Sequence, residues 1–421
     1  MVVSSFQSDQ RSPDRPKAAS AEAIAISPSP SPPDAAYVHI PFCRRRCFYC
    51  DFPVSVVGDT RRGENSGAIA QYIEHLCQEI RHTPSQGTPL QTVFFGGGTP
   101  SLLAVDQLAT LLETLDQHFG IASQAEISME MDPGTFDLPH VQGYRAAGIN
   151  RVSLGVQAFQ AELLQLCGRT HQPADIPIAI AQVRQAGITN VGLDLISGLP
   201  QQTLGHWEES LARAIALQPT HLSVYDLIVE PGTAFARQYQ PGAAPLPSES
   251  QAAQMYRLGQ QRLTAAGYKH YEISNYAQPG SDCRHNRVYW QNRSYYGFGM
   301  GAASYVSGQR FTRPRTRREY VTWLDAGMPI HEPPTSPLDA LLDTLMLGLR
   351  LSEGVSLVAL TAQFGDRAVN QVLRAIAPFL SQDLVRLSET PDPYLFFHDP
   401  EGFLLSNTIL ATIFEALERD F

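Results

Sequence analysis

Apolar, β-branched runs alternate with helical patterns from residue 36 onward. We expect buried strands at 36–40, 92–95, 126–131, 151–156, 191–196 and 221–227. Helical patterns fall between them, at about 67–82, 104–118, 139–147, 174–186 and 203–217, and Gly120, Gly148 and Gly187 stand where three of these helices should end. Alternating strands and helices predict parallel strands joined by right-handed crossovers. Six units predict an α/β fold, an incomplete (βα)6 barrel whose working face lies at the carboxyl ends of the strands.

The pattern changes after a Pro/Gly-rich stretch at 240–247. A helix is expected at 249–266 and a strand at 268–273. A second segment begins near Pro333, with a helix at 337–350, a turn at Glu353-Gly354, two shorter helices, and strand-like pieces at 384–387, 394–398 and 403–405. We therefore expect a barrel at 36–275, a connecting segment at 276–332 and a small winged-helix-like C-terminal domain at 333–421. Residues 1–35, rich in Ser, Pro and Ala, predict a disordered tail.

Composition narrows the class of protein. The formal net charge is −10, and the C-terminal segment has no basic recognition helix, so we expect no nucleic-acid partner. No run approaches the ~18–20 apolar residues of a membrane helix, so we expect peripheral membrane contact at most. Six cysteines with three clustered do not resemble a secreted disulfide framework. We expect a cytoplasmic protein with reduced thiols.

Three cysteines lie close together at the end of the first expected strand: Cys43, Cys47 and Cys50, within YVHIPFCRRRCFYCDF. Thiolates are soft ligands that suit iron–sulfur clusters. The spacing CxxxCxxC offers three ligands to a [4Fe–4S] cluster and leaves one iron open, where S-adenosylmethionine can chelate through its amino and carboxylate groups. A structural zinc site is the alternative, although it normally takes four ligands in paired knuckles. The arginines at 44–46 are either a solvated loop face or a contact for an anionic ligand or an acidic electron donor.

Further polar and glycine-rich positions follow other expected strands. The segment GGGTP, with Gly97, Gly98 and Thr99, comes directly after the second strand, and its glycines let backbone approach a ligand and leave N–H groups free to meet it. Glu130 ends the third strand, where its carboxylate can accept ribose hydroxyls or simply form a salt bridge. Three more polar side chains follow the fourth and fifth strands in the same way: Gln157, Arg169 and Asp194. Such barrels build ligand sites from strand ends.

The segment DCRHNRVYW carries a candidate haem site. His285 and Tyr289 are four residues apart, so a helix would present them on one face. Imidazole and phenolate both ligate haem iron, and Trp290 can stack on a flat macrocycle. The residues alone favour the alternative of a hydrogen-bonded core histidine beside aromatic packing. The glycine-rich segment 295–301 (YYGFGMG) is a weaker signal for backbone close to a planar ligand.

These motifs together resemble those of the HemW haem chaperones, relatives of oxygen-independent coproporphyrinogen III oxidase in the radical S-adenosylmethionine superfamily. The resemblance runs from about Tyr37 to near the C-terminus and is carried by YVHIPFCRRRCFYCDF, GGGTPS, LGVQAF, LDLISGLPQQT, YEISNYA and HNRVYW. Two positions depart from the oxidase: Phe52 stands where it has a further cysteine, and Ser274-Asn275 where it has an Asp-His pair.

The resemblance implies roles for individual residues. S-adenosylmethionine would be contacted by Tyr37, Gly97, Gly98, Thr99 and Glu130, with Tyr49 also in the cofactor site. Gln157, Arg169 and Asp194 match positions where the oxidase binds a second S-adenosylmethionine. Haem would be bound by the motif residues His285, Asn286, Tyr289 and Trp290.

The expected function is that of a haem chaperone that receives electrons from a reducing donor and passes haem to apo-haemoproteins of the respiratory chain. No residue is assigned a catalytic role, and whether the chain is an enzyme stays open. Two alternatives remain: an oxidase that decarboxylates coproporphyrinogen III, and a binding module that a cluster or zinc only stabilises.

Overall fold

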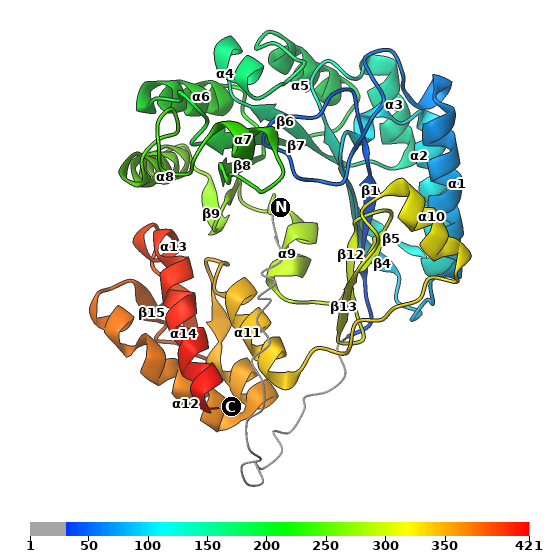
Figure 1. Ribbon diagram of the computed structural model, residues 1–421. Coiled ribbons are helices and arrows are strands. Elements are labelled where there is room, and N and C mark those ends of the chain that lie inside the picture. The colour runs from blue at the N-terminus through cyan, green and yellow to red at the C-terminus, as the bar shows by residue number, and fades with distance from the viewer. Residues whose placement is uncertain (1–30, 421) are drawn as a thin grey trace.

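The computed structural model describes residues 31–420, and its main feature is a curved nine-stranded sheet (Figure 1). The strand order is β11-β1-β4-β5-β6-β7-β8-β10-β9. Six strands run parallel at its centre: β1 (Ala35–Ile40), β4 (Leu90–Gly97), β5 (Ile121–Met131), β6 (Arg151–Gln157), β7 (Asn190–Ser197) and β8 (His221–Asp226). All six match the strands expected from the sequence, so the incomplete barrel is confirmed. The expected tail at 1–35 lies, for residues 1–30, outside the described residues.

Helices cover the outer face of this sheet, and their positions agree with the sequence except for the short helix Ala161–Leu166, which was not expected. They are α1 (Gly67–His82), α2 (Val105–Phe119), α3 (Leu138–Ala147), α4 (Ala161–Leu166), α5 (Asp175–Gln185), α6 (Leu204–Ala216) and α8 (Glu249–Ala265). Outward-facing strand residues such as Val38, Val93 and Phe95 pack against them with no exposed surface, because removing apolar area from water is the main driving force of folding. Gly120 and Gly148 end α2 and α3 at positive φ, as expected.

The sheet is left open at its two edges. β11 (Tyr296–Phe298) pairs in parallel with β1, and β10 (Asn275–Ala277) and β9 (Lys269–Glu272) extend the other side antiparallel to β8. The short helix α9 (Arg284–Trp290) lies in the space between the two edges (Figure 1). Smaller elements complete this part: β2 (Phe42–Cys43), β3 (Ser55–Val56), η1 (Gly63–Asn65), η2 (Pro100–Leu102), α7 (Ala234–Gln238), β12 (Ala303–Val306), β13 (Gln309–Thr312) and α10 (Arg317–Asp325).

The C-terminal part has its own core and a small sheet of order β14-β16-β15. Its elements are α11 (Pro337–Gly348), β14 (Val355–Ser356), α12 (Leu357–Ser381), β15 (Val385–Leu387), β16 (Tyr394–Phe397), α13 (Glu401–Leu404) and α14 (Ser406–Asp420). The two shorter helices expected after Gly354 are present as the two halves of α12, which Gly365 separates with its non-helical φ of 82°. The strand-like piece expected at 403–405 is wrong: these residues end α13 and begin the turn into α14, since a short apolar run does not distinguish a strand from a helix.

No helix in the described part of the chain is both long and apolar enough to cross a membrane.

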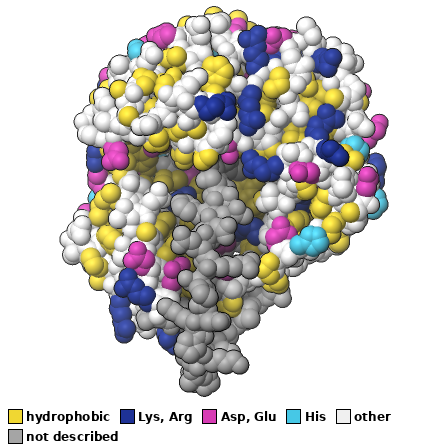
Figure 2. Space-filling model, in the orientation of Figure 1, with side chains coloured by type: hydrophobic (Ala, Val, Ile, Leu, Met, Phe, Trp, Pro, Cys, Tyr) yellow, Lys and Arg dark blue, Asp and Glu magenta, His cyan; other side chains and the backbone are white. Residues whose placement is uncertain are grey.

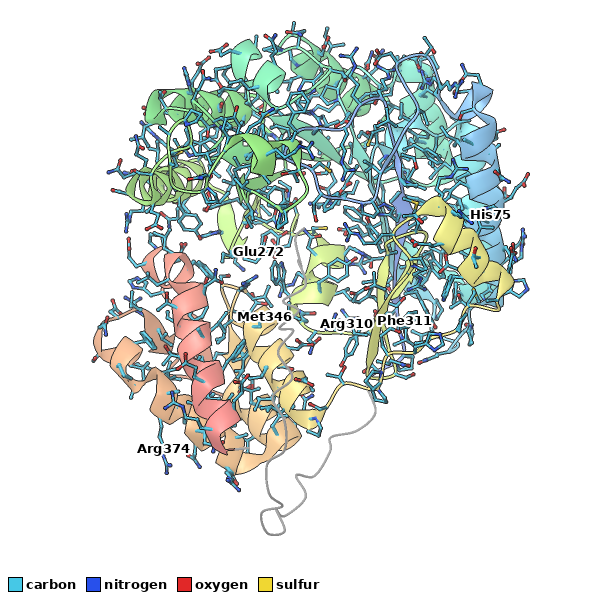
Figure 3. All side chains as sticks on the ribbon, viewed as in Figure 1. His75, Glu272, Arg310, Phe311, Met346 and Arg374 are labelled. Carbon is cyan, nitrogen blue, oxygen red and sulfur yellow. The ribbon has the colours of Figure 1, made fainter. Side chains whose placement is uncertain are left out.

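Side chains and backbone join the two parts. His270 pairs with Asp399 at 2.9 Å, and Arg257 binds Glu401 through two hydrogen bonds of 2.6 and 2.7 Å. Figure 3 shows Glu272 at the end of β9 and Met346 on α11 to either side of the junction. Arg310, on β13, donates to Asp343 of α11 at 3.2 Å.

A buried ion pair attaches the β11–α10 region to α1. Glu79 has no exposed surface and accepts from Arg313 Nε at 2.8 Å, from the Tyr320 hydroxyl at 2.5 Å and from Gly299 N at 2.8 Å. Since the carboxylate is out of water, it depends on these donors to compensate its lost hydration. The segment held in this way packs closely against the loop after β1. Gly301 approaches Pro53 so closely that a Cβ at this position would lie 2.3 Å from the proline ring.

We expect Glu79→Ala to lower the free energy of unfolding by about 3–5 kcal/mol, because it leaves the Arg313 charge buried and unpaired. Urea unfolding followed by tryptophan fluorescence measures the change. Glu74→Ala, an exposed position on the same helix, is the control and should shift the value by less than about 0.5 kcal/mol. Equal effects in the two variants would contradict a specific role for the buried pair.

Candidate functional site

The loop after β1 carries the three cysteines at the carboxyl ends of the strands, as expected. It lies against the glycine segment that follows β4: Gly98 N donates to Ile40 O and Thr99 N to Phe42 O, both at 2.8 Å. A side chain at Gly98 would collide with this backbone, because its Cβ would come within 2.9 Å of the Ile40 carbonyl oxygen. The glycine is therefore required for the two loops to pack together.

One expectation about this segment is wrong. Its N–H groups were expected to be free for a ligand, but Gly97 N donates to Glu130 Oε2 at 3.0 Å, and the amides of Gly98 and Thr99 are used as described above. These amides bind acceptors within the protein, because buried amides need hydrogen-bond partners. A ligand at this segment meets carbonyl oxygens or side chains instead.

A polar network supports the cysteine loop from the strand ends. Arg169 donates through Nη1 to Cys47 Sγ at 3.5 Å, and through Nη2 to Asp132 and to Gly155 O. Asp132 also accepts from the Thr99 hydroxyl at 3.0 Å. The network therefore links the loops after β1, β4 and β5 and orients one thiol.

The thiols themselves suit an iron–sulfur cluster. All six cysteines are free, and Cys43, Cys47 and Cys50 are partly buried on one loop. Burial raises the pKa of the Cys43 thiol well above its usual range and that of Cys50 to about 11. Such thiols ionise when they bind a metal, which replaces the proton as the counter-charge. Three soft donors on one short loop fit three irons of a [4Fe–4S] cluster.

His39 forms a hydrogen bond with Pro53, at the C-terminal end of the cysteine loop. Burial lowers its pKa to about 4, so the ring is neutral. Its Nε2 lies 3.0 Å from the Pro53 carbonyl and therefore carries the proton, and Nδ1 accepts from the Tyr37 hydroxyl at 3.0 Å. Tyr37 is thus held inside the barrel at a fixed position beside the glycine segment.

Carboxylates line the interior just below this loop. Glu130 has a pKa raised to about 7, by burial first and by the nearby Asp194 second. Burial also raises the pKa of Asp194, which accepts from the Ser153 hydroxyl at 2.9 Å. A buried carboxyl group whose ionisation a second one opposes favours a ligand with positive charge or hydroxyl donors.

Gln157 and Tyr49 both lie near the Arg169 guanidinium. Gln157 adopts a positive φ of 66° at the irregular end of β6, a conformation that non-glycine residues seldom adopt. The absence of a side chain at Gly155 makes room here, since a Cβ there would lie 2.7 Å from Asp132 and 3.1 Å from both Arg169 and Gln157. Tyr49 packs beside Phe235.

Helix α9 lies deeper in the barrel, held by a buried carboxylate. Glu126, on β5, accepts from the backbone amides of Arg284 and His285 at 3.2 and 3.1 Å, and Arg151 lies 3.9 Å away. Negative charge at the first turn of a helix satisfies amides that have no helical partner. This anchor places His285 against β4.

His285 and Tyr289 share one face of α9, as expected. His285 Nε2 lies 2.8 Å from the Tyr289 hydroxyl and Nδ1 lies 2.8 Å from the Thr92 hydroxyl. The imidazole also stacks on Phe94, with ring centres 5.3 Å apart, and Phe94 stacks on Tyr37 at 6.2 Å. Burial lowers the His285 pKa to about 3, so this ring is neutral as well.

The other two motif residues differ in their surroundings, and Trp290 lies toward the C-terminal part. Asn286 is buried, and its Oδ1 has no hydrogen-bond partner within the described residues. Trp290 is partly exposed, with the Arg350 guanidinium 6.0 Å above its ring. The motif therefore spans α9 from the barrel interior to the junction. The weaker glycine signal at 295–301 has another explanation, because this segment forms β11 and packs on β1.

Sequence reasoning missed several residues that build the site. Asp132 follows directly after β5. The reasoning that selected Gln157, namely that polar residues at strand ends line the ligand site, would also have selected Asp132. His39 alternates with the outward-facing Val38 and Ile40, which marks it as inward-facing. Glu126 carries no such signal, because its partner α9 lies more than 150 residues further along the chain.

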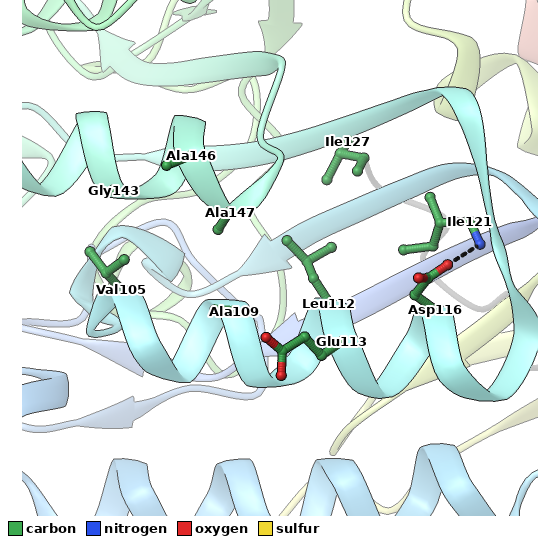
Figure 4. A pocket seen from close by; sticks show the side chains of 10 residues that line it. All are labelled: Val105, Ala109, Leu112, Glu113, Asp116, Ile121, Ile127, Gly143, Ala146 and Ala147. Atoms are coloured by element: carbon green, nitrogen blue, oxygen red, sulfur yellow. Dashed lines mark hydrogen bonds between the residues drawn. The ribbon is translucent and has the colours of Figure 1, made fainter.

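A larger groove lies elsewhere and lacks these features. It sits between α2 and α3 on the outer layer, with a volume of about 560 Å³ (Figure 4). Apolar side chains such as Val105, Leu112 and Ile127 line it, and the Asp116 carboxylate accepts a hydrogen bond from the Ile121 amide at 2.8 Å. The groove presents no convergent donors, unlike the small pocket beside Cys47, Thr99, Asp132 and Arg169.

Comparisons with known proteins agree with this geometry. The sequence profile of the radical SAM superfamily matches residues 37–214, and that of the HemN C-terminal domain matches residues 335–390. The chain is similar to the solved coproporphyrinogen III oxidase HemN of Escherichia coli, with a TM-score of 0.76 and 25% identity over 93% of this chain and 91% of that chain.

Curated relatives are more similar still. The chain is 49% identical to the heme chaperone HemW of Synechocystis over 92% of this chain and 98% of the relative. It is 35% identical to HemW of Bacillus subtilis over 90% of this chain and 98% of the relative. With the three-cysteine loop, the barrel and the C-terminal domain in place, these similarities show that the chain belongs to the HemW family of the radical SAM superfamily.

Proposed function

We propose that this protein is a haem chaperone that carries a [4Fe–4S] cluster and S-adenosylmethionine, and that it delivers haem to apo-haemoproteins of the respiratory chain. The observation that carries the proposal is the presence, in one barrel, of a three-thiol loop at the mouth and a buried Tyr–His pair on α9. The relatives named heme chaperone support haem as the cargo. The need for reduced thiols supports a cytoplasmic location.

Cys43, Cys47 and Cys50 would hold the cluster, and Arg169 and Asp132 would orient Cys47. When bound, a cluster with one open iron supplies an electron to the sulfonium of S-adenosylmethionine. The neutral Tyr37 and the free Oε1 of Glu130 are suited to the adenosine and ribose groups, and carbonyl oxygens of the glycine segment are suited to the amino group. Asp194, Gln157 and Tyr49 complete the surroundings of the ligand.

Tyr289 is the iron ligand that the local hydrogen bonds favour for haem. Both nitrogens of His285 are occupied, by Thr92 and by Tyr289, so iron ligation through the imidazole would break a buried hydrogen bond. The phenolic oxygen retains a lone pair while bonded to His285, and phenolate is an established donor to ferric haem. The neutral His285 imidazole stays hydrogen-bonded to the phenolic oxygen and holds it in place. Trp290 lies toward the C-terminal part, and Asn286 stands on the same helix.

A coproporphyrinogen III oxidase is the second candidate. The likeness to HemN over 93% of the chain is the specific observation that favours it. Phe52 and Ser274-Asn275, which replace residues of the oxidase pattern, favour the chaperone.

Replacement of a cluster ligand should remove the cluster and leave the fold intact. We expect Cys47→Ser to lose iron, sulfide and the brown colour after anaerobic reconstitution, whereas Cys77→Ser, a buried cysteine remote from the loop, keeps all three. Iron and zinc analysis with circular dichroism measures the outcome. A colourless wild-type protein that contains zinc would contradict the proposal.

Removal of the phenol should weaken haem binding. We expect Tyr289→Phe to raise the haem Kd at least tenfold, equivalent to about 1.4 kcal/mol, and to abolish the ferric phenolate charge-transfer band in the absorption spectrum. We expect His285→Ala to retain the band at weaker affinity. Tyr394→Phe, on β16 in the C-terminal part, is the matched control and should titrate like the wild type; an unchanged Kd in both α9 variants would eliminate the site.

An assay of coproporphyrinogen III conversion distinguishes the haem chaperone from the oxidase. We expect the reconstituted protein, supplied with S-adenosylmethionine and reductant under anaerobic conditions, to form no protoporphyrinogen IX from coproporphyrinogen III at an enzymatic rate. The haem-loaded protein should restore activity to a haem-depleted respiratory enzyme. Chromatography of porphyrins and the activity of the recipient provide the readouts, and multiple turnovers of the porphyrinogen would establish the oxidase instead.

A further inference from the structure

Arg350 stands at the junction of the barrel and the C-terminal part, two residues after the end of α11. Its carbonyl oxygen accepts from the Ile273 amide at 2.9 Å, so its backbone is fixed against the turn between β9 and β10. Within residues 31–420 the side chain donates only to the neutral side chain of Asn407, through Nη2 at 3.1 Å, and the buried Nε has no hydrogen-bond partner. Since a guanidinium stays charged in proteins, this one has lost part of its hydration without gaining a counter-charge.

The other charges at this junction are matched in pairs. Carboxylates of the C-terminal part bind basic side chains of the preceding part of the chain: Asp343 with Arg310, Glu353 with Arg287, Asp399 with His270 and Glu401 with Arg257. Figure 2 shows dark-blue and magenta side chains interspersed on the visible face of the C-terminal part, so no broad field of one sign covers it. An anion would therefore be selected by Arg350 itself.

Glu272 is the acid whose charge reaches Arg350, and it does not neutralise it. The Glu272 side chain has no exposed surface, and burial raises its pKa to about 7. Burial lowers the pKa of Arg350 more than the Glu272 carboxyl raises it, and the two side chains form no ion pair in the described part of the chain. The junction therefore has a place for one further negative charge.

Arg350 also lies against the helix that carries the haem motif. Its guanidinium carbon is 6.0 Å from the centre of the Trp290 ring, within the range of a cation–π contact. Trp290 ends α9 directly after Tyr289, and Asn286 shares its face of the helix because it lies four residues earlier. The buried Oδ1 of Asn286 has no partner within the described residues, and an amide in this state can turn to present its NH2 group to an acceptor. An arginine and an amide with unused hydrogen-bonding capacity thus accompany the proposed iron ligand.

We propose that Arg350 binds the propionate carboxylates of haem, with Asn286 as a second contact, so that the C-terminal part holds the acidic edge of the macrocycle and α9 holds the iron. The inference rests on the proposed function, since it requires haem bound at Tyr289. Haem is a flat apolar ring with two carboxylates on one edge, and a guanidinium binds a carboxylate through two parallel hydrogen bonds. Nε and Nη2 of Arg350 form such a fork: Nε is unused, and Nη2 has only a neutral, exposed partner. Trp290, next to Tyr289 in sequence and beside Arg350 in space, is placed to stack on the ring between them.

The test is an absorbance titration with ferric haem and with haem dimethyl ester, both added from dimethyl sulfoxide. The ester keeps the iron and the ring and removes both negative charges. We expect the wild type to bind haem at least tenfold more tightly than the ester, and Arg350→Gln to bind both ligands with the weaker affinity. Arg350→Lys, which keeps the charge without the fork, should retain part of the preference. Two controls should keep the wild-type preference: Asn407→Ala, which removes the same internal hydrogen bond, and Arg374→Gln, which removes an exposed charge on α12 away from the junction (Figure 3).

The spectra separate this role from iron ligation and from loss of the fold. Arg350→Gln should retain the ferric phenolate band, whereas Tyr289→Phe should lose the band and bind haem and ester more weakly alike. A wild type that binds haem and ester equally would overturn the proposal, and this comparison requires no variant. A full preference for haem in Arg350→Gln, with a circular dichroism spectrum like that of the wild type, would overturn it as well and assign the propionates to another residue. A wild type that binds neither ligand would instead refute the proposed function itself.

Discussion

The register of the parallel strands is the constraint on which the site depends. Backbone pairing fixes Ile40 opposite Gly97 and Glu130 opposite Ser153, so that strand ends separated by tens of residues in sequence meet at one edge. The cysteine loop, the glycine segment and the Asp132–Arg169 pair all start from this edge and are held by hydrogen bonds between loops. A slip of one residue in any strand would turn its polar side chains to the outer core and its apolar ones to the interior.

That alternation also explains why the barrel interior is polar. Outward residues such as Val38 and Phe95 pack under the helices, whereas inward residues such as Tyr37, Glu126 and Asp194 face the interior. Buried polar groups are tolerated only with partners, and α9 supplies many of them: its amides satisfy Glu126, and its His285 satisfies Thr92. The short helix is thus part of the barrel's own hydrogen bonding as well as the carrier of the haem motif.

The sequence was sufficient for elements and for residues at strand ends, and insufficient for contacts across the chain. Apolar β-branched runs, 3.6-residue patterns and terminal glycines located the six central parallel strands and all the helices between them except α4, because these signals are local. The cysteine spacing, Glu130 and Arg169 followed from position at strand ends. The inward turn of the Gly97 amide, the anchor of α9 on Glu126 and the pairing of Glu79 with Arg313 depend on residues 33 or more apart, for which one sequence contains no signal. Residues 403–405 were misjudged because three apolar residues do not reveal their period.

Charge is separated by place in this protein, and the separation has a chemical meaning. Inside the barrel, burial raises the pKa of Tyr225 most, and the carboxyl groups of Asp194, Glu272 and Glu130 raise it further, so these four groups lie near one another. Burial weakens each carboxylate as an ion, and a bound cation restores the charged form, so the interior favours a ligand such as a sulfonium with an amino group. Outside, the exposed Arg45 and Arg46 of the cysteine loop carry the opposite sign. The cysteine loop therefore lies between buried carboxyl groups, which favour a cationic ligand, and exposed arginines, whose charge is hydrated by solvent.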